Sequence, residues 1–170
     1  MNPVSGGRIG KRLEEEYSWF FRGEYQSVLR TAFLIVGDRE SARDVTQEAF
    51  IRLFRYWKKV STYDRPDAWV RHVAVRLAIQ LVRRRRLHDL LTPAPESTHI
   101  VDSVIWEVQE AVKELPPTQR AAVALFYFED RPSAEIARIL DCSESTVRVH
   151  LHKARKKLAT VLKESQLDVG

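Results

Sequence analysis

The segment PSAEIARILDCSESTVRVHLHKARKKL, residues 132–158, decides the fold of the C-terminal part of the chain. Its first half carries apolar residues at the spacing of one helix face, and its second half has Val147 and Leu151 four residues apart. Asp141 lies between the halves and tolerates the left-handed backbone that a tight turn needs. With Ser143 as an N-cap, the segment predicts two helices joined by a short turn, a helix-turn-helix.

The second helix of this motif, from about Ser143 to Leu158, is the element expected to enter the major groove of duplex DNA. Arg148 can pair bidentately with guanine, while the later basic residues suit phosphates. The alternative is an ordinary amphipathic helix whose basic face contacts only solvent. The turn and the apolar pair, both at the spacing of a helix-turn-helix, argue against this alternative. The residues assigned to this contact are Ser143, Ser145, Thr146, Arg148, Val149, His150, His152, Lys153, Arg155 and Lys156.

Most of the remaining chain is also predicted to be helical. Apolar residues recur three and four positions apart, and the alternating pattern of half-buried strands is hard to find. Apolar residues make up 44% and charged residues 30% of the 170, which is typical of a folded protein. We therefore predict an all-α fold, with two small helical domains joined by a flexible linker, the second containing the helix-turn-helix.

Residues that typically begin or end helices set the predicted boundaries of the helices and domains. Gly37 ends a first helix and Asp38 caps the second, which runs to about Trp57, and Pro66 opens a third. Paired prolines near residues 93–95 disfavour a continuous helix there. The predicted organisation is a disordered N-terminus at 1–8, a first domain at 9–86, a linker at 87–101, the helix-turn-helix domain at 102–162 and a tail at 163–170. Helices in the second domain are expected over about 102–115, 117–128, 133–140 and from 143.

The positive charge of the chain is concentrated in two segments. The formal net charge is +5, yet residues 58–86 carry nine basic and two acidic residues, and residues 142–158 carry five and one. Two separated basic segments indicate two contacts with nucleic acid. Aromatic residues lie among the basic ones in the first segment, and unpaired bases stack on such rings beside a cationic groove.

Three motifs, in this order, resemble bacterial RNA polymerase sigma factors of the sigma-70 family. The string DVTQEAF at 44–50 resembles their polymerase-binding helix. The string DAWVRHVA at 67–74, followed by an arginine run, resembles their promoter-melting helix. Residues 115–158 resemble their promoter-upstream domain. The short linker and the lack of extra N-terminal regions are typical of the extracytoplasmic-function (ECF) group.

This resemblance implies a sigma initiation factor that binds the RNA polymerase core and directs it to promoters through their minus-ten and minus-thirty-five elements. The helix from Ser143 would then contact the minus-thirty-five element. Single-stranded minus-ten DNA would be held by Lys58, Lys59, Tyr63, Arg65, Arg71, Arg76, Gln80, Arg83 and Arg84. The polymerase-binding residues would be Asp44, Gln47, Glu48, Arg52 and Arg55.

The implied partners are the clamp helices of the largest polymerase subunit, the polymerase flap, promoter DNA and an anti-sigma factor. Charges of both signs on the 44–55 face suit a protein partner better than DNA. The chain departs from the family pattern at Arg76 and Gln80, where asparagine and aspartate are common, and at His150, where arginine is common. Base preferences at these positions therefore cannot be transferred.

Aromatic residues in the first basic segment differ in their expected roles. Tyr63 is a candidate for stacking on a base, and Trp69 is expected in the core. The pattern leaves Trp57 open between the two roles. Two other functions also stay open: a dimeric helix-turn-helix regulator that acts without polymerase, and a polymerase-binding inhibitor that imitates a sigma factor.

The sequence contains no constellation of residues typical of catalysis. It has no Cys/His cluster for zinc and no glycine-rich phosphate loop, so we expect no enzyme activity and no cofactor or metal. Cys142 is the single cysteine, which excludes an internal disulfide and suits a reducing compartment. No apolar run is long enough to span a membrane, and the N-terminus lacks the pattern of a signal peptide. We expect a cytoplasmic protein without membrane insertion.

Overall fold

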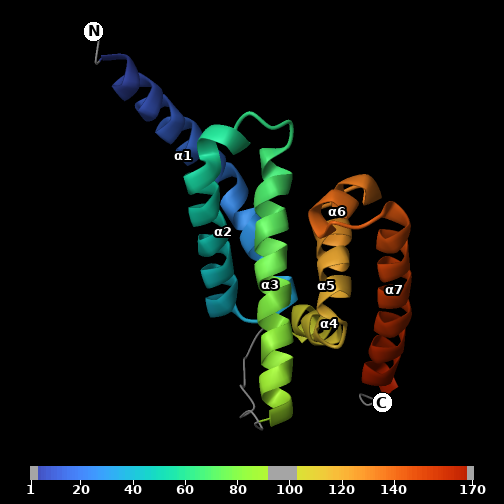
Figure 1. Cartoon of the computed structure of the whole chain (residues 1–170). Coiled ribbons are helices and arrows are strands. Elements are labelled where there is room, and N and C mark those ends of the chain that lie inside the picture. Colours follow the sequence, from blue (N-terminus) through green and yellow to red (C-terminus); the bar gives the residue numbers. More distant parts are fainter. Residues whose placement is uncertain (1–3, 92–102, 168–170) are drawn as a thin grey trace.

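The computed structural model describes residues 4–91 and 103–167, and their elements are all helices. A first unit contains α1 (Val4–Val36), α2 (Arg39–Val60) and α3 (Pro66–Leu91). A second unit contains α4 (Ser103–Lys113), α5 (Pro117–Val123), the π-helical turn η1 (Ala124–Phe128), α6 (Ser133–Leu140) and α7 (Glu144–Leu167). No strand occurs in these two ranges, which confirms the all-α prediction. Figure 1 shows α3 between α2 on one side and the second unit on the other.

Local signals place the junction of α1 and α2 as expected. Gly37 adopts φ +86° and donates its N–H to the Phe33 carbonyl at 2.8 Å, which ends α1. Asp38 then caps α2, since its side chain accepts from the backbone N–H of Ser41 at 2.8 Å. Two other helix ends differ from expectation. α1 begins at Val4 rather than near Ile9, and α3 continues past the arginine run to Leu91.

The first unit packs around the buried faces of its three helices. Phe50 and Leu53 of α2 are 2% and 0% exposed, and Val70 of α3 is fully buried. The apolar spacing along α2 also predicts Phe54 on the buried face, with Ala42, Val45, Ala49 and Leu53. Phe54 is 54% exposed, so that part of the prediction was wrong. The ring of Phe50 takes the inward place instead and meets Phe21 with their centroids 4.9 Å apart.

The helix-turn-helix is present as α6, a tight turn and α7. Asp141 adopts φ 54° and ψ 53° in the turn, and the Ser143 hydroxyl accepts from the backbone N–H of Thr146 at 3.1 Å. Ile136 and Val147 are fully buried and Leu151 is 3% exposed, so the two helices meet on the predicted faces. The helix expected over 117–128 is interrupted, because η1 replaces its second half with π-helical turns.

The two units share one continuous apolar core. Leu125, Ile136 and Ile139 of the second unit belong to the same buried cluster as the α1, α2 and α3 residues. Arg120 of α5 ties the units together, since its guanidinium donates to the carbonyls of Ile35 at 2.7 Å and Leu115 at 2.9 Å. Burial, followed by the nearby charge of Arg86, lowers the pKa of Arg120 to about 10.

The described part of the chain contains no helix that is long and apolar enough to cross a membrane. Residues 92–101 of the predicted linker, residues 1–3 of the predicted N-terminal segment and residues 168–170 of the predicted tail lie outside the described residues.

Candidate DNA and polymerase interfaces

The outer face of α7 carries most of the residues predicted to read duplex DNA. The side chain of Arg148 is 65% exposed, and Val149 is 49% exposed beside it. Thr146 and His150 are only partly exposed, and the Thr146 hydroxyl is bound to that of Ser143 at 2.8 Å. The remaining members of the set are exposed, namely Ser143, Ser145, His152, Lys153, Arg155 and Lys156. The arrangement can present neutral hydrogen-bonding groups near the start of α7 and cations toward its end.

Neighbouring groups determine the contacts of Arg155 and the charge of His150 on α7. Arg155 donates to the Tyr127 hydroxyl at 2.6 Å, and its guanidinium lies 5.7 Å from the ring centroids of Tyr127 and Phe126. Sequence reasoning missed this aromatic support, because η1 lies far from α7 along the chain. Burial and the charge of Lys153 lower the pKa of His150, which favours its neutral imidazole near pH 7.

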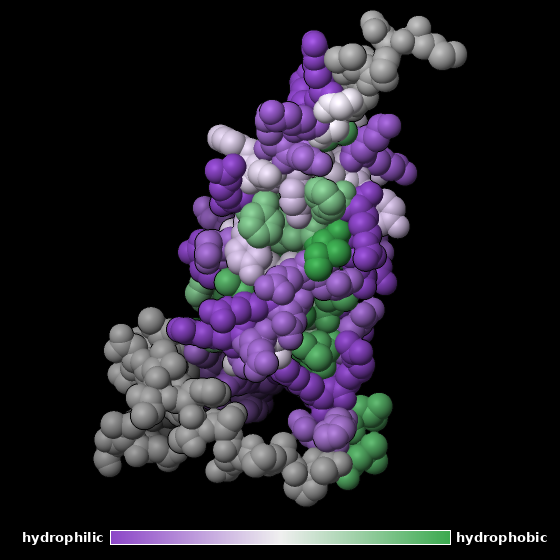
Figure 2. All heavy atoms as spheres, turned by 90° about the vertical axis from the view of Figure 1, so that its left-hand side faces the viewer, coloured by the Kyte–Doolittle hydropathy of each residue, from purple (hydrophilic) through white to green (hydrophobic). Residues whose placement is uncertain are grey.

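The residues predicted to bind polymerase lie along one side of α2. Asp44, Gln47 and Arg55 are exposed. The side chains of Glu48 and Arg52 are about half exposed and form an ion pair at 2.7 Å. Two apolar side chains that the prediction omitted, Ile51 and Phe54, are 48% and 54% exposed on the same helix. Figure 2 views the molecule from the side of α1 and α2 and shows apolar residues gathered among hydrophilic ones. A mixed surface of this kind suits a protein partner.

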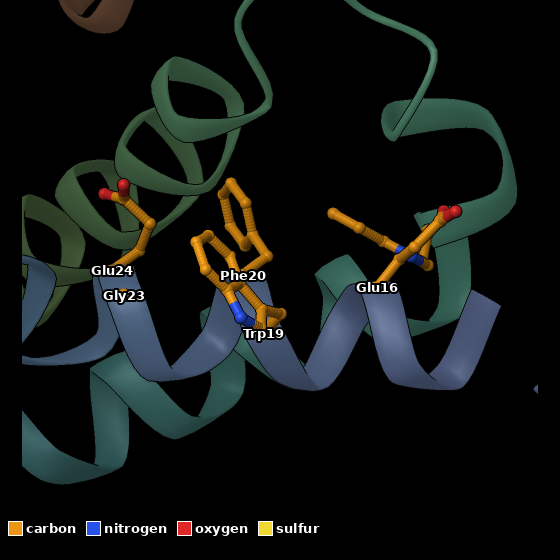
Figure 3. Close-up of a pocket in the computed structure, with 6 residues that line it drawn as sticks. Glu16, Trp19, Phe20, Gly23 and Glu24 are labelled. Atoms are coloured by element: carbon orange, nitrogen blue, oxygen red, sulfur yellow. The ribbon is translucent and has the colours of Figure 1, made fainter. Parts of the chain in front are cut away.

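An open cavity of about 360 Å³ lies beside this unit, but none of the predicted site residues lines it. Its wall includes Trp19, which is 79% exposed, with Glu16 and Phe20 from the same helix (Figure 3). Trp57 closes the cavity from α2 and is 7% exposed, with its ring centroid 5.6 Å from that of Tyr17. The open question about Trp57 is thereby answered, since its ring is part of the core and not free to stack on a base.

The residues predicted to hold single-stranded DNA fall into three groups. Four are exposed at the two ends of the basic segment, namely Lys58, Lys59, Arg83 and Arg84. The second group is Tyr63, which is 41% exposed in the α2–α3 turn, whereas Trp69, which was expected in the core and not as a DNA contact, is half-buried. The third group faces the second unit. Among these, Arg76 and Gln80 line a cavity of about 250 Å³, to which Arg83 of the first group, Thr118, Leu140 and Asp141 also contribute.

Arg65 and Arg71 belong to a group of seven charged residues that we term the interdomain ion cluster. Its members are Glu24, Arg65, Asp67 and Arg71 of the first unit and Glu129, Arg131 and Glu135 of the second. Arg71 is 2% exposed, and its Nε lies 2.5 Å from Oε2 of Glu129. Arg131 Nη1 lies 2.8 Å from Oδ2 of Asp67. The sequence prediction gave Arg71 to DNA and did not foresee these carboxylate partners.

Hydrogen bonding in the cluster fixes the charge of its carboxylates. Burial acts to raise the pKa of Asp67, but hydrogen bonds and charges from Arg65 and Arg131 outweigh it and hold the pKa well below its usual range. The pKa of Glu135 is also lowered, chiefly by the hydrogen bond from Arg65. Both carboxylates are therefore ionised at neutral pH, opposite arginines of the other unit.

Comparison with known protein families decides between the alternatives. The model for Sigma-70 region 2 matches residues 20–88, and the model for Sigma-70, region 4 matches residues 105–158. Both matches belong to one family, lie in the expected order and together cover most of the chain. The chain belongs to the sigma-70 family of RNA polymerase sigma factors.

Relatives place this sigma factor in the ECF group. It is 32% identical to the ECF RNA polymerase sigma factor SigE of Mycolicibacterium smegmatis, over 85% of this chain and 62% of that protein. It is 28% identical to the RNA polymerase sigma-E factor of Streptomyces avermitilis, over 90% of this chain and 88% of that protein. The relatives carry the names of transcription factors and not of enzymes.

Solved structures share the fold across both units. The sigma factor RpoE of Bartonella quintana, crystallised with the anti-sigma factor NepR, matches with a TM-score of 0.75 and 17% identity, covering 88% of this chain and 98% of that one. CnrH, in complex with the cytosolic domain of CnrY, matches with a TM-score of 0.68 and 19% identity, covering 89% of this chain and 90% of that one. Within the described ranges, no group of three or more His, Cys, Asp or Glu residues could hold a metal ion.

Proposed function

We propose that this sigma factor binds the RNA polymerase core through α2, holds the single-stranded minus-ten element along the α2–α3 turn and α3, and docks α7 on the minus-thirty-five element. The observation that carries the proposal is the exposed outer face of α7 on a chain that also bears the mixed α2 face. Such a chain can hold polymerase and promoter at once, as initiation requires. The role adds no chemistry, because the polymerase synthesises the RNA. Its place of action is the cytoplasm.

The partition of roles follows the character of each surface. α7 combines polar side chains that suit base edges with later cations that suit phosphates. The α2 face combines Glu48, Arg52 and the exposed ring of Phe54, and such a surface suits a protein better than a polyanion. A dimeric regulator would need a dimer seam or a sensory domain, which the residue pattern of the first unit does not offer.

Run-off transcription with purified polymerase core on genomic fragments tests the proposal. The chain should give promoter-specific transcripts that core alone does not give, and the start sites should share two upstream elements. A chain that binds DNA but yields no specific transcript with core would contradict the proposal. A footprint over two symmetric half-sites without polymerase would favour the dimeric regulator instead.

The α2 contact can be tested separately with matched variants. Arg55→Glu reverses an exposed charge on the proposed polymerase face and should weaken capture of core at least about tenfold, as expected when an interface charge pair is turned into a repulsion. Arg39→Glu makes the same charge change on the exposed first turn of α2 and should leave core binding unchanged. Equal binding by both variants would remove Arg55 from the interface.

A further inference from the structure

Two aromatic rings on η1 support one cation of the proposed duplex-DNA surface. The π-helical turn places Phe126 beside Tyr127, with their ring centroids 5.0 Å apart and their planes at 78°. Phe126 packs against the shared core, whereas Tyr127 is 52% exposed. Single π-helical turns are uncommon and are frequently found at functional sites. The two rings therefore form a support at the surface that Phe126 anchors in the core.

Arg155 of α7 lies against these two rings and is held by three contacts. Its Nε donates to the Tyr127 hydroxyl at 2.6 Å, and its guanidinium carbon lies 5.7 Å from the centroid of each ring. Both of the latter distances are within the range of a cation–π contact. An unrestrained arginine side chain has many rotamers and loses their entropy when it binds. Because the rings restrict Arg155 beforehand, less entropy is lost when it binds an anion.

The contact between Arg155 and Tyr127 leaves both groups able to donate to an anion. A guanidinium has five N–H donors, and the bond to Tyr127 uses the one on Nε. The partner in this bond is a neutral phenol, so it does not neutralise the positive charge of Arg155. The Tyr127 hydroxyl is the acceptor here, and its own proton can still be donated to a second acceptor. Two donors of different kinds therefore lie side by side at the surface.

The position of Arg155 along α7 indicates which anion these donors meet. Arg155 lies seven residues after Arg148 and three after His152, which is the spacing of one helix face. All three side chains are exposed, and Lys156 adds a further exposed cation next to Arg155. The early part of this face is the part proposed to meet base edges. The anion that continues along the same face is the phosphate backbone of the same duplex.

We infer that Tyr127 is a further DNA contact of this sigma factor, whose hydroxyl binds one phosphate of the duplex together with the Arg155 guanidinium and whose ring positions Arg155 for that bond. This inference rests on the proposed docking of α7 on duplex DNA. The bond from the guanidinium to the phosphate is charge-assisted. The bond from the phenol is strengthened because its oxygen accepts from a cation. The duplex interface thereby extends from the helix-turn-helix to η1.

Removal of a single hydroxyl group tests the inference. Tyr127→Phe keeps the ring and removes only the hydroxyl, and Tyr56→Phe makes the same change at a tyrosine that is 58% exposed on α2. Because phosphate contacts do not depend on base sequence, a fluorescently labelled mixed-sequence duplex at low salt is a sufficient probe. Tyr127→Phe should bind this duplex about three to ten times more weakly than the unaltered chain. Tyr56→Phe should bind it as well as the unaltered chain does.

A double-mutant cycle with Arg155 distinguishes a shared phosphate contact from an indirect structural effect. Arg155→Ala should weaken duplex binding and make the slope of log affinity against log salt concentration about one unit less negative. In the Arg155→Ala chain, Tyr127→Phe should cost little further affinity, because the hydroxyl has lost the guanidinium that it positions. Tyr127→Phe should unfold in urea at the same midpoint as the unaltered chain, since the lost bond lies at an exposed surface.

The possible outcomes separate this inference from the proposed function. If Arg155→Ala weakens duplex binding and Tyr127→Phe does not, α7 binds DNA as proposed but Tyr127 is not part of the contact. If Tyr127→Phe costs the same affinity with and without Arg155, the two groups do not share a phosphate and the inference is refuted. If neither variant changes duplex binding, the inference fails together with the assignment of Arg155 to DNA, while run-off transcription still decides the function of the chain.

Discussion

At the scale of single residues, Arg148 and Lys156 of α7 should make different kinds of contact with DNA. Arg148 lies on the early, exposed part of the helix and is expected to reach a base edge, whereas Lys156 lies about two turns later among cations that are expected to contact phosphates. Arg148→Ala should cost about 1–3 kcal/mol against one base pair and relax preference there, while Lys156→Ala should weaken all sequences alike. Titration of duplexes that differ at single positions measures both effects.

The salt dependence of the same titrations supplies the control. Lys156→Ala should lose one phosphate contact, so its log affinity should fall less steeply with log salt concentration, with a slope about one unit less negative than that of the unaltered chain. A uniform loss of affinity for Arg148→Ala across every duplex would show that Arg148 holds a phosphate and does not read a base.

Single-residue predictions from the sequence succeeded where the determinant was local. Asp38 and Ser143 cap their helices, and Asp141 takes the left-handed turn, because each depends on neighbours within a few residues. The burial of Arg71 and the exposure of Phe54 depend on which distant helix covers each face. Helical spacing does not contain that information.

At the scale of elements, the backbone of Asp141 sets the angle between α6 and α7. Its φ of 54° costs a β-branched residue more than it costs aspartate, and costs glycine nothing. Asp141→Val should lower the free energy of unfolding by roughly 1–2 kcal/mol, while Asp141→Gly should change it little. Urea denaturation of the two variants measures the difference. Equal stability of Val and Gly at this position would show that the turn can relax.

Element boundaries also show what the sequence could and could not predict. α6 begins and ends as predicted, since proline and the turn residues bracket it. η1 was missed because π-helical turns have no residue signature of their own, and here they bring the Glu129 N–H to the Ala124 carbonyl at 3.2 Å. That irregular turn presents Glu129 to Arg71.

At the scale of the whole molecule, the two units are joined by a shared apolar core as well as by ions. Arg120 donates to carbonyls at the ends of α1 and α4, so one buried guanidinium satisfies backbone groups of both units. The sequence predicted two helical domains but not this joint surface, because each half has enough apolar residues to be a plausible domain alone. Arg65 and Arg71 lie at this joint and were predicted as DNA contacts, because the sequence does not show which carboxylates of the other unit lie beside them.

Acid should weaken this joint before it melts the isolated helices. The pKa of Asp67 is lower in the folded chain than in the unfolded chain, so the unfolded chain binds more protons as the pH falls. The contribution of ionised Asp67 to the free energy of unfolding is fully present above about pH 5, and it is lost progressively as the pH falls toward the pKa of Asp67 in the folded chain. Glu135 and Asp38 have lowered pKa values as well and act in the same direction.

The free energy of unfolding between pH 3 and pH 7 therefore distinguishes Asp67 from an ordinary surface carboxylate. Asp67→Asn should be less stable than the unaltered chain at pH 7 and should show a shallower loss of stability toward pH 3, because its neutral amide cannot titrate. Asp64→Asn, at an exposed position of the same turn, should follow the unaltered chain throughout. Parallel curves for Asp67→Asn and the unaltered chain would mean that Asp67 has the same pKa folded and unfolded, and that its contact with Arg131 does not persist in solution.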